Sequence, residues 1–402
     1  MNKQQLIDIG QEHIANLIDE NKLLSEQIQR IDFKQILDLY REAQIHKENE
    51  DKTIEKIKYT EKDKLTQMEY EHLESIGSRI IREGKYAVVT MAGGQGTRLG
   101  HNGPKGTYKI NLNCGDKYLF EIVIESLKKA NKKYNTIIPW YIMTSKENND
   151  QTAQFLEQHN FFGYPSESIM LFKQGELPLI DKNGKIILQE NGCIKEASDG
   201  NGGIYEAMVK NGILDNMKQK GIEWVMVGGI DNILLNIADP VFIGLTFSEG
   251  NMIGSKSVVR SSPKEKVGVF CKINGRPGII EYIELPEKMA EETDANGNYI
   301  YGDVNILNHL YSIKALEKIG EAKLPYHAAI KKTSYLNDNG EFITPEEPNA
   351  YKFESFIFDA FRTFDNMSLF RVKRNEEFAP IKNAEGADSP ETARELYNNL
   401  NK

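Results

Sequence analysis

Cysteine, histidine and long apolar runs are all scarce in this chain of 402 residues. Its three cysteines, Cys114, Cys193 and Cys271, are odd in number, lie far apart and form no CxxC pair, which indicates reduced thiols and no zinc ribbon. The seven histidines have no HxxxH spacing, and no Ser-His-Asp or Cys-His combination is evident. The sequence therefore indicates neither zinc chemistry nor a nucleophilic triad.

Membrane spans and a basic surface are also lacking. No run of about 18 apolar residues occurs, and the first residues, Met1–Gln5, lack the apolar core of a signal peptide. The 50 basic and 59 acidic residues leave a net charge of −9, which argues against general nucleic-acid binding because that requires a basic surface. We expect a cytoplasmic protein that binds neither membrane nor nucleic acid and that concentrates its important cations in a pocket.

A change in composition near residue 82 predicts three parts. Residues 1–82 contain almost no glycine or proline, and their apolar residues recur at helical spacing. We interpret them as a helical cap, with a partner-binding arm as the alternative. Residues 83–347 alternate apolar runs with helical stretches, which is typical of a Rossmann-like α/β core with a mixed, mostly parallel sheet. Residues 348–402 are expected to form a small C-terminal domain.

The periodicity also predicts individual elements. Amphipathic helices are expected at 14–31, 33–40 and 68–81, and the core helices near 119–130, 152–159 and 205–219. Core strands are expected at 86–91, 140–144, 169–172 and 224–227. Two later strands, 267–273 and 278–285, flank Asn274-Gly275, a hairpin signal. Residues 351–364 are predicted to form one helix with a buried stripe of phenylalanines.

The most distinctive segment follows the first core strand. Residues 92–100 have the sequence Ala-Gly-Gly-Gln-Gly-Thr-Arg-Leu-Gly, and Pro104-Lys105-Gly106 comes shortly afterwards. Glycine lets a backbone turn sharply and aim several N–H groups at one anion, and Arg98 and Lys105 add full positive charges. The spacing matches neither the P-loop nor GxGxxG. The residues alone thus predict a phosphate-binding loop of another kind, with a purely structural turn as the alternative.

This segment resembles the signature of the UDP-sugar pyrophosphorylases, in particular the eukaryotic-type UDP-N-acetylglucosamine (N-acetylhexosamine) pyrophosphorylase branch, whose members carry LAGGQGTRLG followed by PKG. Met91 stands where the family usually has leucine, which is a volume-conserving change. The resemblance extends in the family's order over roughly residues 85–385, through the segments 139–145, 173–175, 199–203, 227–232, 348–352 and 380–384. It implies a nucleotidyltransferase core.

The resemblance implies a role for each residue that matches a family motif. Arg98, Lys105 and Lys352 correspond to catalytic cations of the family. Without the resemblance, the local sequence would place Lys352 on the solvent-exposed polar face of the predicted helix. UTP-binding positions correspond to Met91, Ala92, Gly93, Gly94, Gln174 and Gly200, and sugar-binding positions to Asn201, Glu281, Tyr282 and Asn305. Because alternate residues of a strand face opposite sides, Glu281 and Tyr282 require a bulge or twist if both contact the ligand.

Asp231 follows the apolar run Trp224–Ile230, and its own chemistry is ambiguous. A carboxylate in this position can cap a helix or bind Mg²⁺, and Asn232, Asn236 and Asp239 offer alternative caps. The residues alone leave the two interpretations nearly even. The resemblance favours the second, since this position corresponds to the family's metal-coordinating aspartate. Mg²⁺ would then be held by one carboxylate, phosphate oxygens and water.

As a whole, the resemblance implies uridylyl transfer from UTP to N-acetylglucosamine-1-phosphate, which gives UDP-N-acetylglucosamine and pyrophosphate with Mg²⁺ as cofactor. The sugar phosphate is already an anionic nucleophile, so positioning and charge neutralisation suffice. Asn201 favours an N-acetylated sugar because glucose-specific relatives have histidine there. The alternatives are N-acetylgalactosamine-, glucose- or galactose-1-phosphate as substrate, or a non-catalytic UDP-sugar-binding protein. We expect a monomer or weak homo-oligomer.

Overall fold

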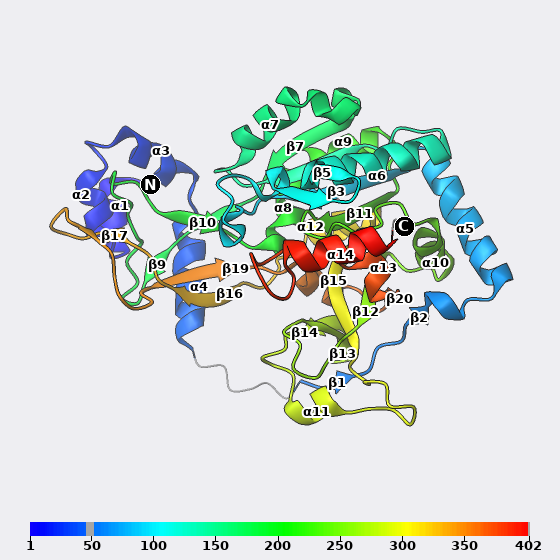
Figure 1. The fold of residues 1–402 in the computed structure, drawn as a ribbon. Helices are drawn as coiled ribbons and strands as arrows, with labels where there is room; N and C mark the ends of the chain where they lie inside the picture. Colours follow the sequence, from blue (N-terminus) through cyan, green and yellow to red (C-terminus); the bar gives the residue numbers. More distant parts are fainter. Residues whose placement is uncertain (46–51, 401–402) are drawn as a thin grey trace. The chain divides into compact units, whose positions relative to one another are not determined.

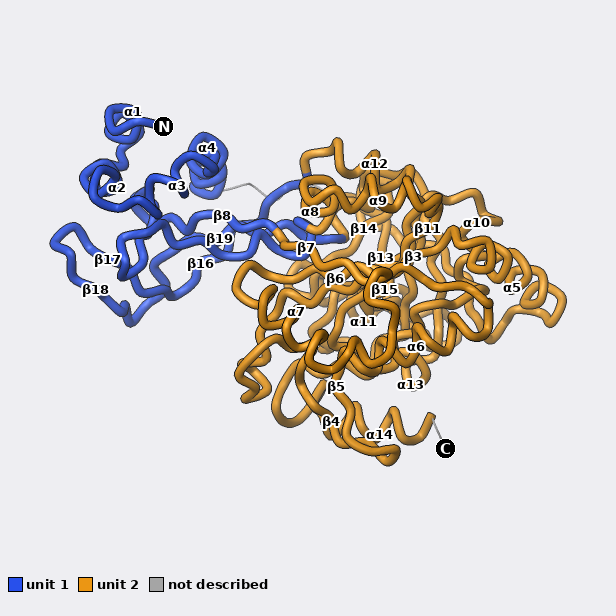
Figure 2. The backbone as a smooth tube through the Cα atoms, turned by 90° about the horizontal axis from the view of Figure 1, so that it is seen from above, with its two compact units in different colours: residues 1–51, 175–203, 324–357 blue, residues 52–174, 204–323, 358–402 orange. Residues whose placement is uncertain are grey.

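The computed structural model describes residues 1–45 and 52–400. The chain divides into two compact units, each assembled from three separated segments (Figure 2). This division differs from the three consecutive domains expected with boundaries at 82 and 347, because segments far apart in the sequence complete the same core. Unit 1 consists of Met1–Asp51, Gly175–Gly203 and Leu324–Ile357, and unit 2 of Lys52–Gln174, Ile204–Lys323 and Phe358–Lys402.

Unit 1 packs four short helices against strands from later in the chain. The helices are α1 (Lys3–Asp8), α2 (Glu12–Leu17), α3 (Lys22–Arg30) and α4 (Phe33–Gln44). Three small antiparallel sheets supply the strands: β19 (Ala350–Glu354) with β16 (His327–Lys331) and β9 (Ile180–Asp181), β8 (Glu176–Pro178) with β10 (Glu196–Ser198), and β17 (Tyr335–Leu336) with β18 (Phe342–Ile343). Leu6, Ile14, Phe33, Ile186 and Phe353 share one core, whereas α5 (Gln67–Arg82), the last helix of the predicted cap, belongs to unit 2.

Polar capping residues divide the N-terminal segment into short helices. The expected helix over residues 14–31 is two helices, α2 and α3, because the Asn21 side chain accepts a hydrogen bond from Leu24 N (3.1 Å) and starts a new one. Asp32 caps α4 in the same way, accepting from Gln35 N (3.0 Å). The short polar side chains of Asn21 and Asp32 therefore determine where these helices begin, which the spacing of apolar residues did not show.

Unit 2 contains a large mixed sheet with helices on both faces (Figure 1). Strand β3 (Tyr86–Met91) lies between β11 (Trp224–Gly229) and β6 (Trp140–Thr144), and all three are parallel. β7 (Ile169–Lys173) continues the parallel part, whereas β15 (Asp303–Ser312) pairs antiparallel with β11 and with β12 (Ile253–Val259). Every residue of β3, β6 and β11 is buried, as a sheet covered on both sides requires.

Alternating side chains of β3 divide the helices of unit 2 between two layers. Tyr86 and Val88 enter the main apolar core with residues of α5 (Gln67–Arg82), α6 (Leu119–Tyr134) and α10 (Pro240–Ser248). On the other face, the Tyr141 hydroxyl of β6 donates to Asn216 of α9 (Ile213–Gln219) at 2.8 Å.

The remaining elements of unit 2 are β1 (Ile54–Glu55), β2 (Thr60–Glu61), β4 (Lys109–Leu112), β5 (Gly115–Tyr118), α7 (Asn149–Gln158), α8 (Ile204–Lys210), β13 (Val269–Ile273), β14 (Arg276–Ile280), α11 (Glu287–Glu291), α12 (Ile313–Gly320), β20 (Ser368–Arg371), α13 (Arg374–Glu377) and α14 (Pro390–Leu400).

Most predicted core elements are confirmed, with local corrections. The predicted bounds of β3 and β6 agree with the structure, and the helix expected over 205–219 is divided into α8 and α9 at Gly212, whose φ is +68°. The Asn274-Gly275 hairpin is confirmed, with both residues at positive φ. β14 ends at Ile280, so the expected extended segment to Leu285 is wrong. There the chain turns instead, with Leu285 N donating to Glu281 O (3.1 Å).

The helix predicted over residues 351–364 is also wrong. Its first part is strand β19, whose backbone is held by pairing with β16 and β9, and its second part is the 3-10 helix Ile357–Thr363. Phe353 packs in the core of unit 1 while Phe361 is buried in unit 2. Phenylalanines spaced like one helical stripe thus fill two separate cores, which apolar periodicity alone cannot distinguish.

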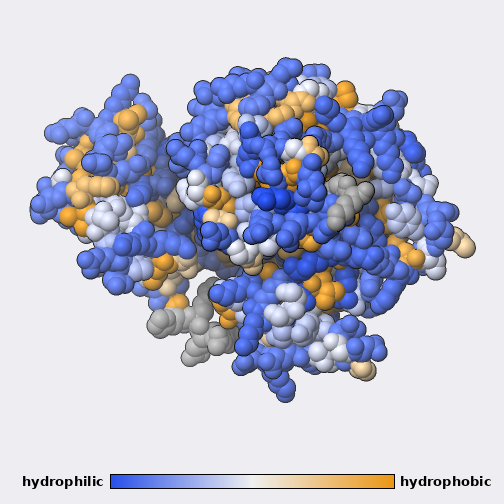
Figure 3. Space-filling view, in the orientation of Figure 1, coloured by the Kyte–Doolittle hydropathy of each residue, from blue (hydrophilic) through white to orange (hydrophobic). Residues whose placement is uncertain are grey.

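The face drawn in Figure 3 is mainly hydrophilic, and its apolar areas are small and separated. Across residues 1–45 and 52–400, helices long and apolar enough to traverse a bilayer are absent. All three cysteines lie in the described part of the chain and are free thiols, with Cys114 exposed and Cys193 and Cys271 buried.

His309 makes stability depend on pH. It is fully buried on β15, with its Nδ1 2.5 Å from Ser255 Oγ, and burial lowers its pKa to about 3. The unfolded chain takes up this proton near the ordinary pKa of about 6.5, so the folded state loses stability as pH falls from about 6.5 towards 3. The loss is expected to be about 1.4 kcal/mol per pH unit. Urea unfolding of the wild type and His309→Gln at pH 7 and pH 4.5 measures it. If the free energy of unfolding changes with pH equally in the two proteins, His309 is not the source of the pH dependence.

Candidate active site

The glycine-rich segment after β3 forms a closed loop in unit 2. Gln95 and Pro104 are bridge partners, and Gly96 N donates to Gly103 O (3.0 Å) while Lys105 N donates to Gly94 O (3.0 Å). His101 lies inside the loop and contacts Thr107 Oγ1 at 2.7 Å. The sequence predicted the loop, and the structure adds that its two ends are tied together beside the carboxyl end of a central strand.

Lys105 and Asp231, predicted separately, are brought together. Lys105 Nζ lies 3.5 Å from Asp231 Oδ2, and both side chains are partly exposed, at 16% and 24%. The pairing follows from the sheet, because β3 and β11 are parallel neighbours and Ile230 N donates to Met91 O (3.2 Å) just beyond their ends. Ligands of α/β sheets bind outside such carboxyl ends. Arg98 is exposed in the same loop and makes no ion pair with any described residue.

Asp231 was interpreted either as a helix cap or as a Mg²⁺ ligand, and the next helix in the chain is not capped by it. α10 is capped by Asp239, whose Oδ1 accepts from Val241 N (3.0 Å) and Phe242 N (3.4 Å). Asp231 instead faces Lys105 at the mouth of the loop. A Cβ on Gly229 would lie 2.6 Å from Asp231 Oδ1, so the carboxylate lies close to the end of β11. Asp231 is therefore available for binding.

Gln174, predicted to contact the uracil, lies against the glycine-rich loop. It follows β7, and its backbone N donates to Thr144 O (2.8 Å). A Cβ on Gly93 would lie 2.7 Å from Gln174 Oε1, so the Gln174 amide lies close against the loop backbone. Met91 and Ala92 are buried beneath, while Gly94 is exposed. An amide there can both donate and accept at the edge of a base.

Glu281 and Asn305, two predicted sugar contacts, lie close to the same backbone. Asn305 N donates to Gly268 O (3.0 Å), and a Cβ on Gly268 would lie 3.0 Å from Glu281 Oε1. Asn305 Oδ1 accepts from Leu307 N (2.9 Å) in a bulged part of β15. Tyr282 is 44% exposed in the turn after β14. That turn replaces the bulge or twist that was expected on an extended segment.

The remaining predicted residues belong to unit 1. Gly200 has φ +91°, and a Cβ there would lie 2.3 Å from Ser355 O, so this position requires glycine. Asn201 Oδ1 accepts from Ile357 N (2.9 Å), which fixes the orientation of its amide. Lys352 lies on strand β19 and not on a helix, and its Nζ contacts Glu354 Oε1 at 2.7 Å. Unit 1 thus holds Gly200 and Asn201 against the segment that follows Lys352.

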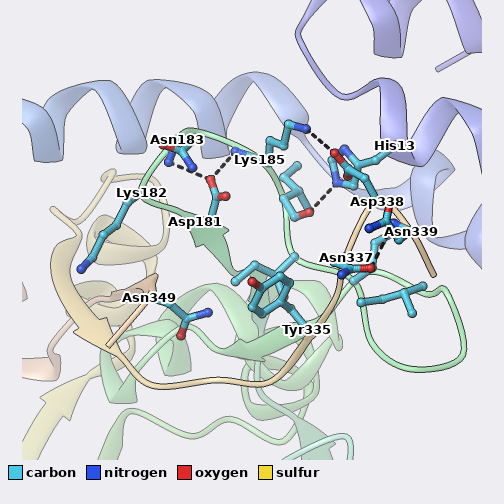
Figure 4. A pocket seen from close by; sticks show the side chains of 14 residues that line it. His13, Asp181, Lys182, Asn183, Lys185, Tyr335, Asn337, Asp338, Asn339 and Asn349 are labelled. Carbon is cyan, nitrogen blue, oxygen red and sulfur yellow. Dashed lines mark hydrogen bonds and ion pairs between the residues drawn. The ribbon is translucent and has the colours of Figure 1, made fainter. Parts of the chain in front are cut away.

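A cavity of about 500 Å³ in unit 1 contains none of the predicted residues (Figure 4). Its polar side chains already hold the surrounding loops: Asp181 Oδ1 accepts from Asn183 N and Lys185 N, both at 2.8 Å, and Lys185 Nζ lies 3.0 Å from Asp338 Oδ2. Asn349 similarly bonds to both the N and the O of Thr333. These groups are committed to loop structure, so the cavity is a weaker candidate than the glycine-rich loop.

A metal at this site would rely on few protein atoms. Among the described residues, histidine, cysteine and carboxylate side chains do not gather in groups of three that could hold an ion. Asp231 offers one partly exposed carboxylate. That donor set fits Mg²⁺, which commonly binds through one or two carboxylates together with substrate phosphates. It does not fit a metal that needs a complete protein cage.

Sequence reasoning missed Asn148. This fully buried residue precedes α7 and donates from Nδ2 to Ala92 O (3.1 Å) and Gly94 O (3.4 Å) of the loop. It lies just beyond the segment 139–145, which the resemblance had singled out. The signal that could have found it is an asparagine at a strand-to-helix junction, which usually caps its own helix.

The chain matches a family model over residues 32–388, described as UTP--glucose-1-phosphate uridylyltransferase. It is similar to the human UDP-N-acetylhexosamine pyrophosphorylase-like protein 1, with 40% identity over 80% of this chain and 66% of that protein. It is 39% identical to the UDP-N-acetylglucosamine pyrophosphorylase of Saccharomyces cerevisiae over 80% of this chain and 70% of that one.

Solved structures agree with the sequence relatives. The crystal structure of the uridine diphosphate N-acetylglucosamine pyrophosphorylase from Trypanosoma brucei in complex with an inhibitor matches with a TM-score of 0.84 and 29% identity, over 98% of this chain and 83% of that one. The aligned part of this chain spans just under two thirds of the length of the human relative.

Proposed function

The chain belongs to the UTP--glucose-1-phosphate uridylyltransferase family, and from this membership and its site we propose that it transfers the uridylyl group from UTP to N-acetylglucosamine-1-phosphate, giving UDP-N-acetylglucosamine and pyrophosphate. The observation that carries the proposal is the meeting of Lys105 and Asp231 at 3.5 Å beside the glycine-rich loop. A loop, a cation and a carboxylate at adjoining strand ends supply what a nucleoside triphosphate needs.

The proposed chemistry depends on positioning and charge. The phosphate of the sugar attacks the α-phosphorus of UTP, and pyrophosphate leaves, so no proton has to be removed from the nucleophile. Loop N–H groups, Arg98 and Lys105 would bind the triphosphate and neutralise the charge that develops on it. Gln174 and Gly200 would contact the uracil, and Lys352 the sugar phosphate after exchanging its partner Glu354 for that anion.

Mg²⁺ is proposed as the cofactor, with Asp231 as its protein ligand. When bound, the ion would neutralise phosphate charge and help to align the triphosphate. Asp231 suits this role because its carboxylate is partly exposed and its present partner, Lys105, can move to the phosphates.

The sugar is proposed to be N-acetylated. Asn201, Glu281, Tyr282 and Asn305 are the proposed contacts, and the names of the human and yeast relatives favour an N-acetylhexosamine. Asn201 is held by Ile357 N through its carbonyl oxygen, so its amide nitrogen is the group oriented for donation.

A pyrophosphate-release assay over a panel of sugar 1-phosphates tests the proposal. With UTP and Mg²⁺, N-acetylglucosamine-1-phosphate is expected to give a kcat/KM at least about tenfold above glucose- and galactose-1-phosphate, because an unpaired polar group in a binding site is costly. The ratio of kcat/KM for N-acetylglucosamine-1-phosphate to that for its epimer N-acetylgalactosamine-1-phosphate measures how strongly the enzyme discriminates between the two sugars. A preference for glucose-1-phosphate would identify a different sugar, and UDP-sugar binding without any pyrophosphate release would identify a non-catalytic protein.

A further inference from the structure

Asn148 is placed between two parts of unit 2 that lie far apart in the sequence. It directly precedes α7, after β6, and its side chain reaches the backbone of the loop after β3, 56 residues earlier for Ala92 and 54 for Gly94. It is fully buried. A buried amide must satisfy both its oxygen and its nitrogen, so the direction of this side chain is strongly determined.

The hydrogen bonds of Asn148 assign its amide. Oδ1 accepts from Ser145 N (2.8 Å), and Ser145 Oγ accepts in return from Asn148 N (3.1 Å). The oxygen is thereby fixed, and Nδ2 is left to donate to the carbonyls of the loop, Ala92 O and Gly94 O. Since carbonyl oxygens cannot donate, this is the one orientation that satisfies all these groups.

Asn148 is diverted from the role that its position would normally give it. Asparagine at an N-cap usually accepts a hydrogen bond from the first turn of its helix. Within residues 52–400, the Asn148 side chain makes no such bond to α7, although Thr152 N still donates to its backbone oxygen (2.9 Å). The helix therefore gives up a side-chain cap, and the loop gains a buried donor.

The consequence for the loop is the direction of its peptide groups. Ala92 O is turned to Asn148, and Gly94 O to Asn148 and Lys105 N, so these two carbonyls of the turn point into the protein. In the described part of the chain, the backbone N–H groups of Gly93, Gly94 and Gln95 have no hydrogen-bond acceptor. Successive outward N–H groups form an anion-binding concavity.

We propose that Asn148 is a positioning residue for phosphate recognition: its amide holds the loop carbonyls inward so that the N–H groups of Gly93, Gly94 and Gln95 face the polyphosphate. The proposal rests on the proposed function for the identity of the nucleotide. Asn148 does not itself touch the ligand. Its effect must therefore appear in the phosphates of the ligand and not in the base.

The isosteric variant Asn148→Asp tests this. The carboxylate keeps the acceptor for Ser145 N but replaces the donor with a second acceptor that faces two carbonyl oxygens. Calorimetric Kd values are measured with Mg²⁺ for uridine, UMP, UTP and inorganic tripolyphosphate. The expected result is a Kd about tenfold to a hundredfold higher for UTP and tripolyphosphate, with the Kd for uridine unchanged.

Asn149→Asp is the matched control, since it adds the same charge one residue later. Asn149 Oδ1 accepts from Thr144 Oγ1 (2.8 Å) while its Nδ2 faces the exposed Asp150, so aspartate preserves the inner contact. This control is expected to bind all four ligands as the wild type does. If Asn148→Asp does not fold, Asn148→Ala decides, because it removes the donor without adding charge and should weaken the same two ligands.

The outcomes separate the two proposals. Unchanged UTP and tripolyphosphate binding in Asn148→Asp, or an equal loss for uridine and UTP, would overturn the role of Asn148, since the second pattern marks a general structural effect. A wild-type protein that binds tripolyphosphate but no uridine compound would overturn the proposed function and leave the loop inference standing. Wild-type protein that binds none of the four overturns both.

Discussion

Lys105→Ala is expected to lower kcat by about 10²- to 10³-fold and to leave the fold intact. The side chain contributes charge at the site, where its Nζ faces Asp231 at 3.5 Å. What Lys105 contributes to the loop is its backbone N–H, which donates to Gly94 O, and alanine keeps that bond. Turnover is measured by pyrophosphate release at saturating substrates, and the fold by thermal unfolding.

Lys109→Ala is the matched control for this variant. Lys109 is an exposed lysine on β4, close in sequence to the loop, and its Nζ lies over the ring of Tyr118, 5.1 Å from the centroid. It is expected to retain the wild-type kcat. Near-normal turnover in Lys105→Ala would remove Lys105 from the catalytic residues, whereas equal losses in both variants would point to a loss of general positive charge.

Asp231→Asn is expected to lose about 10²- to 10³-fold in kcat and to need more Mg²⁺ for half-maximal activity. The amide has nearly the same shape, so the change removes the negative charge that a hard cation requires. The same change removes the carboxylate that faces Lys105. UTP binding without Mg²⁺ is therefore expected to be unchanged or tighter, and the gain in affinity on adding Mg²⁺ to be lost.

Titration of activity against Mg²⁺ and calorimetry with and without the ion measure these effects. Asp215→Asn serves as the control, because Asp215 is an exposed carboxylate of α9 that faces Lys218 at 3.5 Å. It should show wild-type Mg²⁺ dependence. A wild-type Mg²⁺ response in Asp231→Asn would show that the carboxylate does not hold the metal, and the aspartate would then serve only to position Lys105.

The local sequence was sufficient to predict several features that the structure confirms. The run Tyr86–Met91 is a fully buried strand with the predicted bounds, and Asn274-Gly275 is a hairpin turn. The glycine-rich segment is a loop at the carboxyl end of that strand. Each of these features depends on interactions within a few residues, such as β-branched side chains in an extended chain or glycine at positive φ.

Other predictions failed where the same local sequence pattern is compatible with more than one backbone conformation. The phenylalanine spacing over residues 351–364 suits a helical stripe, but Phe353 lies on a strand in unit 1 and Phe361 is buried in unit 2. The expected strand through Glu281 and Tyr282 ends at Ile280, because the chain turns after pairing with β13. In the first case, strand partners distant in sequence decided the backbone conformation. In the second case, the strand ends where its hairpin pairing with β13 ends, at Ile280.

By itself, the sequence determined the chemistry that is present: a glycine-rich loop with Arg98 and Lys105, and an acidic residue at the end of an apolar run. Only the tertiary structure decided how that chemistry is arranged. It set Asp231 opposite Lys105 and gave the capping role to Asp239, and it turned Asn148 from its helix to the loop. The physical reason is that these choices depend on which strand ends become neighbours and on which buried polar groups must pair there, and both are properties of the assembled sheet.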